Sequence, residues 1–326
     1  MTVKKKVFLI LILALLAAAA VFAVGRSAAA RSGAKDGPYE ISVLCRERSA
    51  ESRAAVKAGI DQASNDLNAE VSYITLSHEG DDAEQISLLE REAANGADAV
   101  VIAPVRSAKL GQAVKEAAQK LPVVAILSAP EGAPGIPTVS CDDFRLGQSL
   151  AERVLKDGVS ADPKIIVSGV NPKCGDSENL YRGVQDVFKR NKIPFSTLQL
   201  RDAQEAGAAA RSLLPGLKNE VWVELDGGAL EAVGQAKREL LKTGQPADAR
   251  IYGAGRSDAV TSLLEERVIS AVGVRNEYNI GYLGIKTAVD GIRRKKGENV
   301  QVNFIIADGT NLYSPENERI LFPFVS

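Results

Sequence analysis

Arginines follow the first apolar run of the sequence and are its most distinctive chemistry-bearing group. The stretch SVLCRERSAESR, residues 42–53, carries Arg46, Arg48 and Arg53 after its apolar part. A guanidinium is a planar fork of donors that suits carboxylate and phosphate oxygens. Glu47 stands between the first two arginines, so a solvated ion-pair cluster is the alternative interpretation. The residue types alone leave both open.

Catalytic chemistry has little support elsewhere in the sequence. The single histidine, His78, lies in the polar stretch LSHEGDDAEQ, and no G-x-S-x-G nucleophile elbow occurs. Acidic pairs at 81–82 and 142–143 precede helix-period segments, where carboxylates usually cap the helix. We therefore expect no enzyme activity, no catalytic residue, no metal site and no cofactor.

Nucleotide and nucleic-acid binding are also disfavoured. The motif GAGRSD, residues 253–258, follows an apolar run but lacks a third glycine and comes late in the chain. No phosphate-binding loop G-x-x-x-x-G-K-[ST] occurs, and the formal net charge of −1 gives no basic bias. We expect no nucleic acid among the partners.

The three cysteines, Cys45, Cys141 and Cys174, are too few and too scattered for a zinc pattern. Because their number is odd, at least one stays unpaired. We expect them to be small buried residues at strand ends and in a loop.

The N-terminal segment indicates export. Three lysines at 4–6 precede an uncharged apolar run over 7–24, and an Ala28-x-Ala30 cleavage site follows. The length of the run lies between that of a signal-peptide core and that of a spanning helix, so residues 1–30 are either a signal peptide or a membrane anchor. The lysines keep the N-terminus in the cytoplasm, which places the remaining chain in the periplasm or on the outer face of the cell membrane.

Apolar runs alternate with helix-period segments after a linker at 31–37. Apolar strand-like runs occur at 41–45, 70–76, 97–104, 122–128, 138–143, 164–170, 195–200, 221–225, 249–255 and 269–274. Helical periods occur at 50–67, 82–95, 107–120, 144–158, 177–190, 208–214, 228–243, 258–267 and 276–297. This alternation predicts an α/β fold with two doubly wound parallel sheets.

In this order, the segments resemble the periplasmic binding proteins of the ribose- and galactose-binding group (sugar-binding type 1), whose lobes also form the core of lactose-repressor-type regulators. The resemblance covers about residues 39–322. The stretches that carry it are AAVKAGIDQAS, ANGADAVVIAPV, KLPVVAILSA, VSCDDFRLGQSLAERVL, YRGVQDVF, ELDGGALEAVGQAKRELLKTG, IYGAG, VRNEYNIGYLGIKTAVDGI and PENER.

The resemblance implies two lobes joined by three crossovers, with a small-molecule ligand between them and a hinge that closes on it. The expected N-terminal lobe is 38–141 plus 276–306, and the expected C-terminal lobe is 142–275 plus 307–326. A membrane partner would recognise the closed form.

The sequence departs from sugar-binding members at several site positions. Family members place aromatic residues after strand one, where this chain has Ser52 and Arg53, and an Asp-Arg pair where it has Ser128 and Ala129. These substitutions remove features that usually bind a neutral sugar.

Arginines fill the other gaps. Arg106 follows ADAVVIAPV, Gly255 and Arg256 replace the aspartate expected after IYGAG, and Arg275 replaces a polar amide at the last crossover. In the other lobe, we expect Glu178, Tyr181 and Asp226 to be ligand contacts or helix caps. We predict a ligand site that contains Arg46, Arg48, Arg53, Arg106, Ser128, Glu178, Tyr181, Asp226, Arg256 and Arg275. This set indicates a sugar-like, anionic ligand such as a phosphorylated sugar or a carboxylate.

We therefore expect an extracytoplasmic solute-binding protein, monomeric, that delivers its ligand to an ABC permease. The alternative is a ligand-sensing subunit that presents its closed form to a membrane sensor kinase, which an uncleaved anchor would suit. A transcription regulator would need a DNA-binding module before the core, and an exported enzyme would show turnover.

Overall fold

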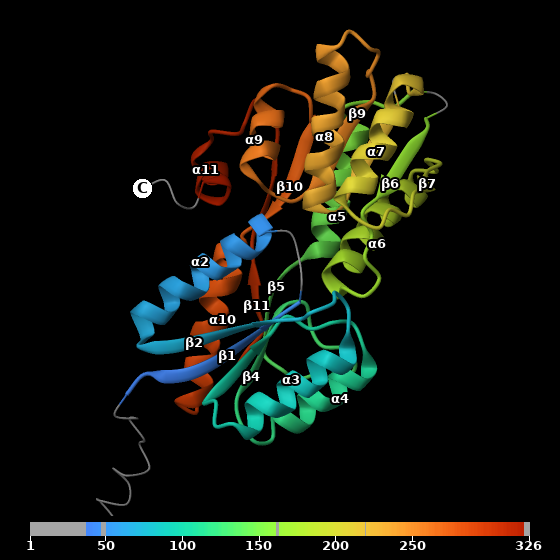
Figure 1. The fold of residues 1–326 in the computed structure, drawn as a ribbon. Helices are drawn as coiled ribbons and strands as arrows, with labels where there is room; N and C mark the ends of the chain where they lie inside the picture. Colours follow the sequence, from blue (N-terminus) through green and yellow to red (C-terminus); the bar gives the residue numbers. More distant parts are fainter. Residues whose placement is uncertain (1–36, 47–49, 161–162, 219, 323–326) are drawn as a thin grey trace, which may run out of the picture. The chain divides into compact units, whose positions relative to one another are not determined.

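The structure is a computed structural model that describes residues 37–46, 50–160, 163–218 and 220–322, with the side chains of 50–52 left aside. Two six-stranded sheets organise residues 40–322 (Figure 1). The expected export segment at 1–30 lies outside the described residues. Among the helices of the described residues, none is long and apolar enough to cross a membrane.

Sheet A and its helices form the first lobe. In spatial order its strands are β11 (Val300–Val302), β5 (Thr138–Cys141), β4 (Val123–Leu127), β3 (Ala99–Ile102), β1 (Tyr39–Cys45) and β2 (Ala69–Thr75). Its helices are α2 (Ala50–Leu67), α3 (Asp82–Ala94), α4 (Ala108–Ala117) and α10 (Glu277–Ile292). The central strands β3 and β4 are buried along their whole length, which is why they are continuous apolar runs.

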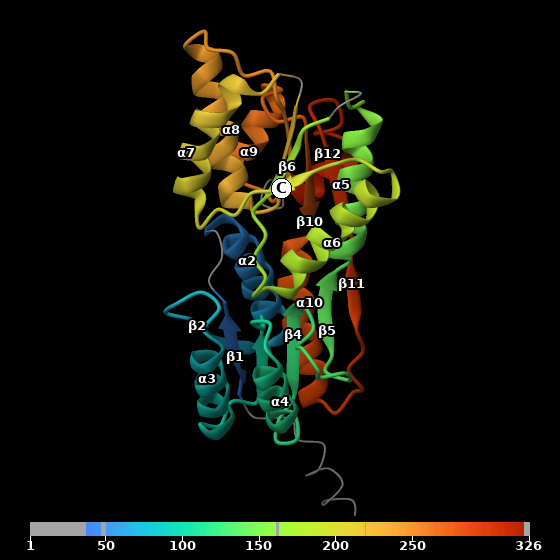
Figure 2. The same cartoon turned by 90° about the vertical axis from the view of Figure 1, so that its right-hand side faces the viewer.

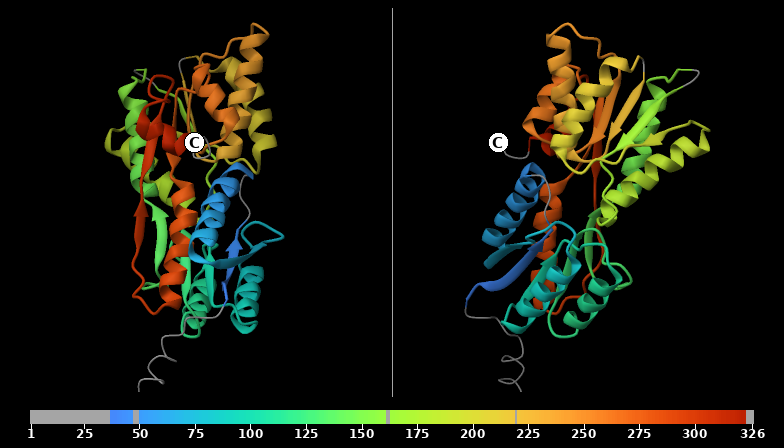
Figure 3. Two further views of the ribbon diagram at one scale, coloured as in Figure 1. Left: turned by 90° about the vertical axis from the view of Figure 1, so that its left-hand side faces the viewer. Right: turned by 45° about the vertical axis from the view of Figure 1, so that its right-hand side comes forward.

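Sheet B and its helices form the second lobe. In spatial order its strands are β12 (Phe304–Ala307), β10 (Ala271–Arg275), β9 (Arg250–Ala254), β8 (Val221–Glu224), β6 (Ile165–Ser168) and β7 (Ser196–Thr197). Its helices are α5 (Asp143–Lys156), α6 (Gly175–Arg190), α7 (Ala203–Leu213), the short 3-10 turn η1 (Leu214–Gly216), α8 (Gly227–Lys242), α9 (Asp258–Glu265) and α11 (Pro315–Leu321). Figure 3 shows helices on both faces of each sheet.

The chain passes between the sheets three times (Figure 2). It leaves sheet A after β5, returns after β10, and crosses again between β11 and β12 at Asn303. The expected N-terminal lobe ran to residue 306, whereas Phe304–Ala307 pairs antiparallel with β10 in sheet B. The third crossover therefore comes three residues before the position expected from the sequence.

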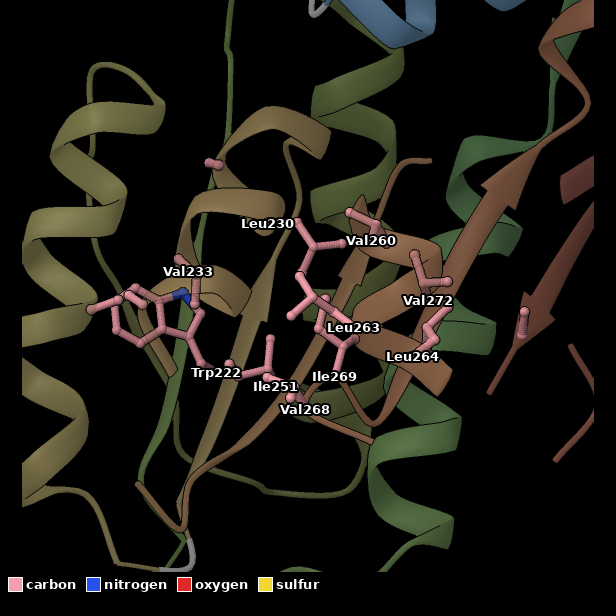
Figure 4. Packing of buried hydrophobic residues seen from close by; sticks show 14 of the residues in the cluster. Trp222, Leu230, Val233, Ile251, Val260, Leu263, Leu264, Val268, Ile269 and Val272 are labelled. Carbon is pink, nitrogen blue, oxygen red and sulfur yellow. The ribbon is translucent and has the colours of Figure 1, made fainter. Parts of the chain in front are cut away.

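The second lobe has an apolar core on each face of sheet B. Trp222 packs among side chains of α8, α9 and neighbouring strands on one face, as Figure 4 shows for Leu230, Val233 and Ile251. Val221 and Val223 point to the other face and pack against α5 and α6.

The run expected at 195–200 forms only the two-residue strand β7, which is exposed because it is an edge strand paired with β6 alone.

Reciprocal glycines allow close packing of one helix pair in each lobe. A methyl group at Gly59 of α2 would overlap the carbonyl oxygen of Tyr278 in α10, and one at Gly281 would overlap that of Val56. In the second lobe, Gly147 of α5 approaches the backbone of α6 in the same way. These backbones lie too close for any side chain at the contact.

The acidic pairs behave as the sequence predicted. Asp81 caps α3 by accepting from the backbone N–H of Glu84 at 2.9 Å, and Asp142 caps α5 by accepting from Arg145 N–H at 2.9 Å. Each carboxylate satisfies a donor that the first helical turn leaves free.

Candidate functional site

A cavity of about 510 Å³ opens at the carboxyl ends of the sheet B strands. We call it the second-lobe cavity. The loops that follow β6, β7 and β8 supply most of its wall, and Glu79 of the first lobe contributes to it. The polar and charged residues of the wall are Glu79, Asn171, Ser177, Gln199, Arg201, Asp202, Asp226 and Arg275. Both signs of charge are present, so the wall has no single electrostatic preference.

A cavity of about 400 Å³ opens at the carboxyl ends of the sheet A strands. We call it the first-lobe cavity. Its wall is largely apolar, with contributions from Ala103, Ile126 and Leu127 at the ends of β3 and β4. The polar and charged residues of its wall are Cys45, Arg46, Arg53, Lys57, Tyr73 and Thr75. Open α/β sheets bind ligands at this end of their strands, so both cavities are candidate halves of one kind of site.

Arg46 joins the two lobes through a buried ion pair. Its Nη2 pairs with the Oδ1 of Asp176 in α6, and the two side chains are 0% and 1% exposed. Its Nη1 donates to the carbonyl oxygen of Pro104 at 3.0 Å. The Nε is buried and has no partner among the described residues. Because a buried N–H without an acceptor is costly, this donor is available to a ligand or a water molecule.

Arg275 forms a second buried ion pair at the crossover after β10. Its Nε donates to the Oδ1 of Asp143 at 2.5 Å, and the side chains are 5% and 3% exposed. Burial disfavours the charged form, but the carboxylates of Asp143, Asp176 and Glu277 outweigh it and raise the pKa of Arg275. The predicted anion-binding guanidinium thus already has protein carboxylates beside it, although it lines the second-lobe cavity.

Arg106 also pairs across the lobes, in a more exposed position than Arg46. Arg106 Nη1 lies 2.5 Å from Glu178 Oε2, with side chains 43% and 30% exposed. The Arg106 backbone N–H donates to the Lys173 carbonyl oxygen at 2.7 Å, and Asn171 Nδ2 donates to Glu79 Oε1 at 2.6 Å. The loop between β6 and α6 and the first turn of α6 therefore contact the first lobe.

Other predicted site residues lie in different surroundings. Arg48 lies outside the described residues. Arg53 lines the first-lobe cavity, is exposed, and has no ion pair or hydrogen bond within the described part of the chain. Ser128 is buried after β4, and its side chain lies close to Gly175 at the start of α6. Arg256 donates to the Leu321 carbonyl oxygen at 2.6 Å and does not line either cavity.

Two predicted residues of the second lobe take structural partners. Tyr181 is hydrogen-bonded through its hydroxyl to Thr197 Oγ1 at 2.7 Å and is not part of the cavity wall. Asp226 caps α8 by accepting from Ala229 N–H at 2.9 Å, and it also lines the cavity. Of the second-lobe predictions, Asp226 and Arg275 are therefore the ones that reach this cavity.

Tyr73 was missed by the sequence reasoning. It lies in β2, lines the first-lobe cavity, and has the ammonium of Lys57 at 4.9 Å from its ring centroid. Burial, followed by the charges of Asp61 and Cys45, raises the pKa of its hydroxyl above the ordinary range. The sequence feature that could have revealed Tyr73 is an aromatic residue near the end of the strand-like run that follows β1. Aromatic residues make up only 5% of the chain, so this one is conspicuous.

Burial makes two of the three cysteine thiols weakly reactive. Cys45, Cys141 and Cys174 form no disulfide. Burial raises the pKa of Cys45 to about 11, against the lowering effect of Arg53 and Arg46. Burial also raises the pKa of Cys141 to about 12, with Asp143 adding to the effect. Both side chains are therefore protonated at neutral pH.

Comparison with known protein families identifies the family to which this fold belongs. The periplasmic binding protein domain matches residues 41–296. The chain belongs to the periplasmic binding protein family. This membership and the two parallel-sheet lobes confirm the resemblance and the fold class expected from the sequence. No curated protein matches the sequence of this periplasmic binding protein.

Solved structures share the fold at low sequence identity. A carbohydrate transporter solute-binding protein from Agrobacterium radiobacter, in complex with D-arabinose, is 22% identical with a TM-score of 0.77, and the match covers 88% of this chain and 100% of that one. An ABC transporter solute-binding protein from Agrobacterium vitis with bound D-fucose is 20% identical with a TM-score of 0.78, covering 87% and 100%. The XylFII–LytSN complex is 16% identical with a TM-score of 0.73, covering 85% and 99%.

Proposed function

We propose that this protein is an extracytoplasmic solute-binding protein that captures a small sugar-like ligand between its two lobes and delivers it to an ABC permease. The observation that carries the proposal is the pair of cavities at the carboxyl ends of sheets A and B. Family membership supports an extracytoplasmic location and binding without turnover. Crossovers between the lobes give a hinge for closure on the ligand.

A sugar-like ligand is supported by the chemistry of the walls. Asn171, Gln199 and Asp226 offer amide and carboxylate groups to hydroxyls in the second-lobe cavity, and Tyr73 offers an aromatic ring in the first-lobe cavity. Related folds were determined with D-arabinose and D-fucose bound, which supports the same ligand class here.

The preference for an anionic ligand stays a prediction, and fewer of the predicted arginines now support it. Arg46, Arg106 and Arg275 each pair with a carboxylate, so most of their charge is offset. Arg53 is the predicted arginine in a cavity wall that has no such partner within the described residues. An anionic group would therefore be recognised at the first-lobe end of the site, by Arg53 and by the free Nε of Arg46.

A thermal-shift screen tests both levels of the proposal. The purified protein is heated with D-arabinose, D-fucose, D-glucose and D-galactose, and in parallel with glucose 6-phosphate, glucuronate and inorganic phosphate. Stabilisation by at least one sugar or sugar derivative supports solute binding, since a ligand that binds the native state raises its apparent stability. A shift with neutral sugars and none with their charged counterparts would remove the anionic preference. No shift with any compound would contradict the sugar-binding proposal.

A sensing role is the second candidate. The similarity to XylFII in its complex with LytSN supports a version in which the closed form is presented to a membrane sensor kinase. An uncleaved N-terminal anchor would suit that role, whereas a mature chain that starts near Arg31 would weaken it. N-terminal sequencing of the exported protein distinguishes the two, and light scattering of the same sample tests the expected monomer.

A further inference from the structure

Glu224 is a buried carboxyl group directly beneath the second-lobe cavity. It is the last residue of β8, is 0% exposed, and pairs in register with Ser168, the last residue of β6. Leu225 and Asp226, the next two residues, line the cavity. A carboxyl group is rarely buried without a role, because its charged form loses the hydration of water.

The partners of Glu224 are arranged around an ionised carboxylate. Trp222 Nε1 donates to Ser168 Oγ at 2.7 Å, so the Ser168 proton is free to point to Glu224 Oε2 at 2.5 Å. The backbone N–H of Asp226 donates to Glu224 Oε1 at 3.2 Å. Both carboxylate oxygens therefore act as acceptors. We call Trp222, Ser168, Glu224 and Asp226 the Glu224 network.

The backbone around the Glu224 network leaves room for this carboxyl group. Gly169 follows Ser168 and has a φ of +76°, a conformation that favours glycine. A methyl group on Gly169 would overlap Glu224 Oε1 and would lie 2.9 Å from the Leu225 nitrogen. Gly169 also lines the cavity. The two cavity-forming loops after β6 and β8 thus meet at Glu224.

Protonation would weaken these contacts. The O–H of a neutral Glu224 would donate to Ser168 Oγ, with the serine hydroxyl turned away, and the Asp226 N–H would donate to a neutral oxygen, which is a weaker acceptor than a carboxylate. Burial raises the pKa of Glu224 to about 7, the Ser168 hydrogen bond opposes the rise, and the Asp226 carboxylate adds to it. Trp222 also opposes the rise. Both charge states are therefore populated near neutral pH.

We propose that Glu224 is a positioning residue whose ionised form holds Asp226 and the β8–α8 loop in the ligand-binding arrangement, so that protonation of Glu224 weakens ligand capture. The inference rests on the proposed function, because it concerns the affinity of the same site. At pH 6 about one molecule in eleven would carry the ionised group, given a pKa of about 7. The apparent Kd is then weaker at pH 6 than at pH 8, by up to about tenfold when only the ionised form binds, because the competent fraction divides the intrinsic Kd.

A ligand-free titration tests the network first. Trp222 is the single tryptophan of the chain, so its fluorescence reports the Ser168 and Glu224 contacts without interference from other indoles. We expect its emission to change between pH 6 and pH 8 in the wild type, to stay constant in Glu224→Gln, and to change at a higher pH in Ser168→Ala, which loses the opposing hydrogen bond. The matched control is His78→Gln, since His78 is the single histidine and lies in an exposed polar segment. A constant wild-type emission, or an unchanged transition in Glu224→Gln, would overturn the inference.

Ligand titrations test the coupling to binding. Calorimetry with D-arabinose, D-fucose, D-glucose and D-galactose is run at pH 6 and pH 8 on the wild type and on Glu224→Gln. We expect a difference in Kd of up to about tenfold between the two pH values for a bound sugar in the wild type, and less than about a twofold difference in the variant. Binding with a pH-independent Kd in the wild type overturns the inference alone, whereas no binding by any sugar overturns the proposed sugar ligand and this inference with it.

The free energy of unfolding is expected to change with pH in the opposite direction from ligand affinity. Because the folded-state pKa of Glu224 is raised from 4.5 to about 7, its contribution to stability is greatest below the unfolded pKa and is lost as the pH rises through 7. Affinity is expected to rise over the same interval. If affinity and stability fall together as the pH rises, Glu224 has only a structural role and the inference is wrong.

Discussion

Arg46 and Asp176 form an ion pair between residues 130 positions apart, and the side chains of both are almost completely buried. The arginine directly follows β1 of sheet A, and the aspartate lies in the first turn of α6 beside sheet B. A predicted ligand-binding arginine thus serves as a contact between the lobes, and its Nε is left for further recognition.

Removing one member of this pair is expected to destabilise the protein. Arg46→Ala would remove the guanidinium that pairs with the buried Asp176 carboxylate, and breaking comparable buried pairs costs about 3–5 kcal/mol. Chemical denaturation measures the loss. Arg211→Ala is the matched control, because the pair between Arg211 and Glu239 is exposed and should change stability by less than about 1 kcal/mol. Equal stability of Arg46→Ala and the wild type would show that the buried pair is not formed in solution.

Arg275→Ala is expected to affect both stability and binding. The sequence predicted Arg275 as a ligand contact, and the structure pairs it with buried Asp143. The truncation should therefore cost about 3–5 kcal/mol of stability as well as affinity. Asp143→Asn in the Arg275→Ala background is expected to recover part of the stability and none of the affinity. An unchanged Kd in Arg275→Ala would exclude Arg275 from the site.

Arg53 tests the preference for charged ligands. Arg53→Ala should weaken binding of an anionic sugar such as glucose 6-phosphate by about tenfold or more, because a charge-assisted hydrogen bond contributes about 1.5–3 kcal/mol. Binding of a neutral sugar should change by less than a factor of three. Calorimetry compares the two ligands, with the exposed Arg91→Ala as the control. If Arg53→Ala weakens both ligands equally, Arg53 does not select for charge.

Gly59 tests the close packing of α2 against α10. A methyl group there would overlap the Tyr278 carbonyl oxygen, so Gly59→Ala should destabilise the protein by about 1–3 kcal/mol through overpacking. Gly216→Ala is the control, since nothing lies within 4 Å of its added methyl group. Thermal unfolding of both variants provides the comparison. A Gly59→Ala variant as stable as Gly216→Ala would contradict the observed helix separation.

The fold followed from local patterns, whereas the partners of the arginines did not. Buried runs such as Val123–Leu127 and capping residues such as Asp142 have signatures within a few residues of each other. The acids that neutralise Arg46 and Arg275 lie 130 and 132 positions away. Sequence spacing cannot reveal such pairings, because Arg46 meets its partner across the two lobes and Arg275 meets its partner where β10 packs beside α5. The carboxylates that offset Arg46 and Arg275 were therefore not predicted from the sequence.

The same reasoning explains why Glu224 went unnoticed. In the sequence VWVELD it is one polar residue at a strand end, where exposed carboxylates are common. Its burial depends on Ser168 in the adjacent strand and on the space left by Gly169. Both belong to a segment more than fifty positions earlier in the chain, as the separation of 56 between Ser168 and Glu224 shows.

Ligand capture between the lobes is tested most directly by hydrogen–deuterium exchange with and without a mixture of D-arabinose, D-fucose, D-glucose and D-galactose. We predict slower exchange in segments of both cavities, namely 53–57 and 73–75 in the first lobe and 168–177 and 224–229 in the second. Segments at the opposite ends of the strands, such as 118–123, should be unaffected and serve as the internal control. Exchange that is unchanged in both lobes, or slowed in only one, would contradict a ligand held between them.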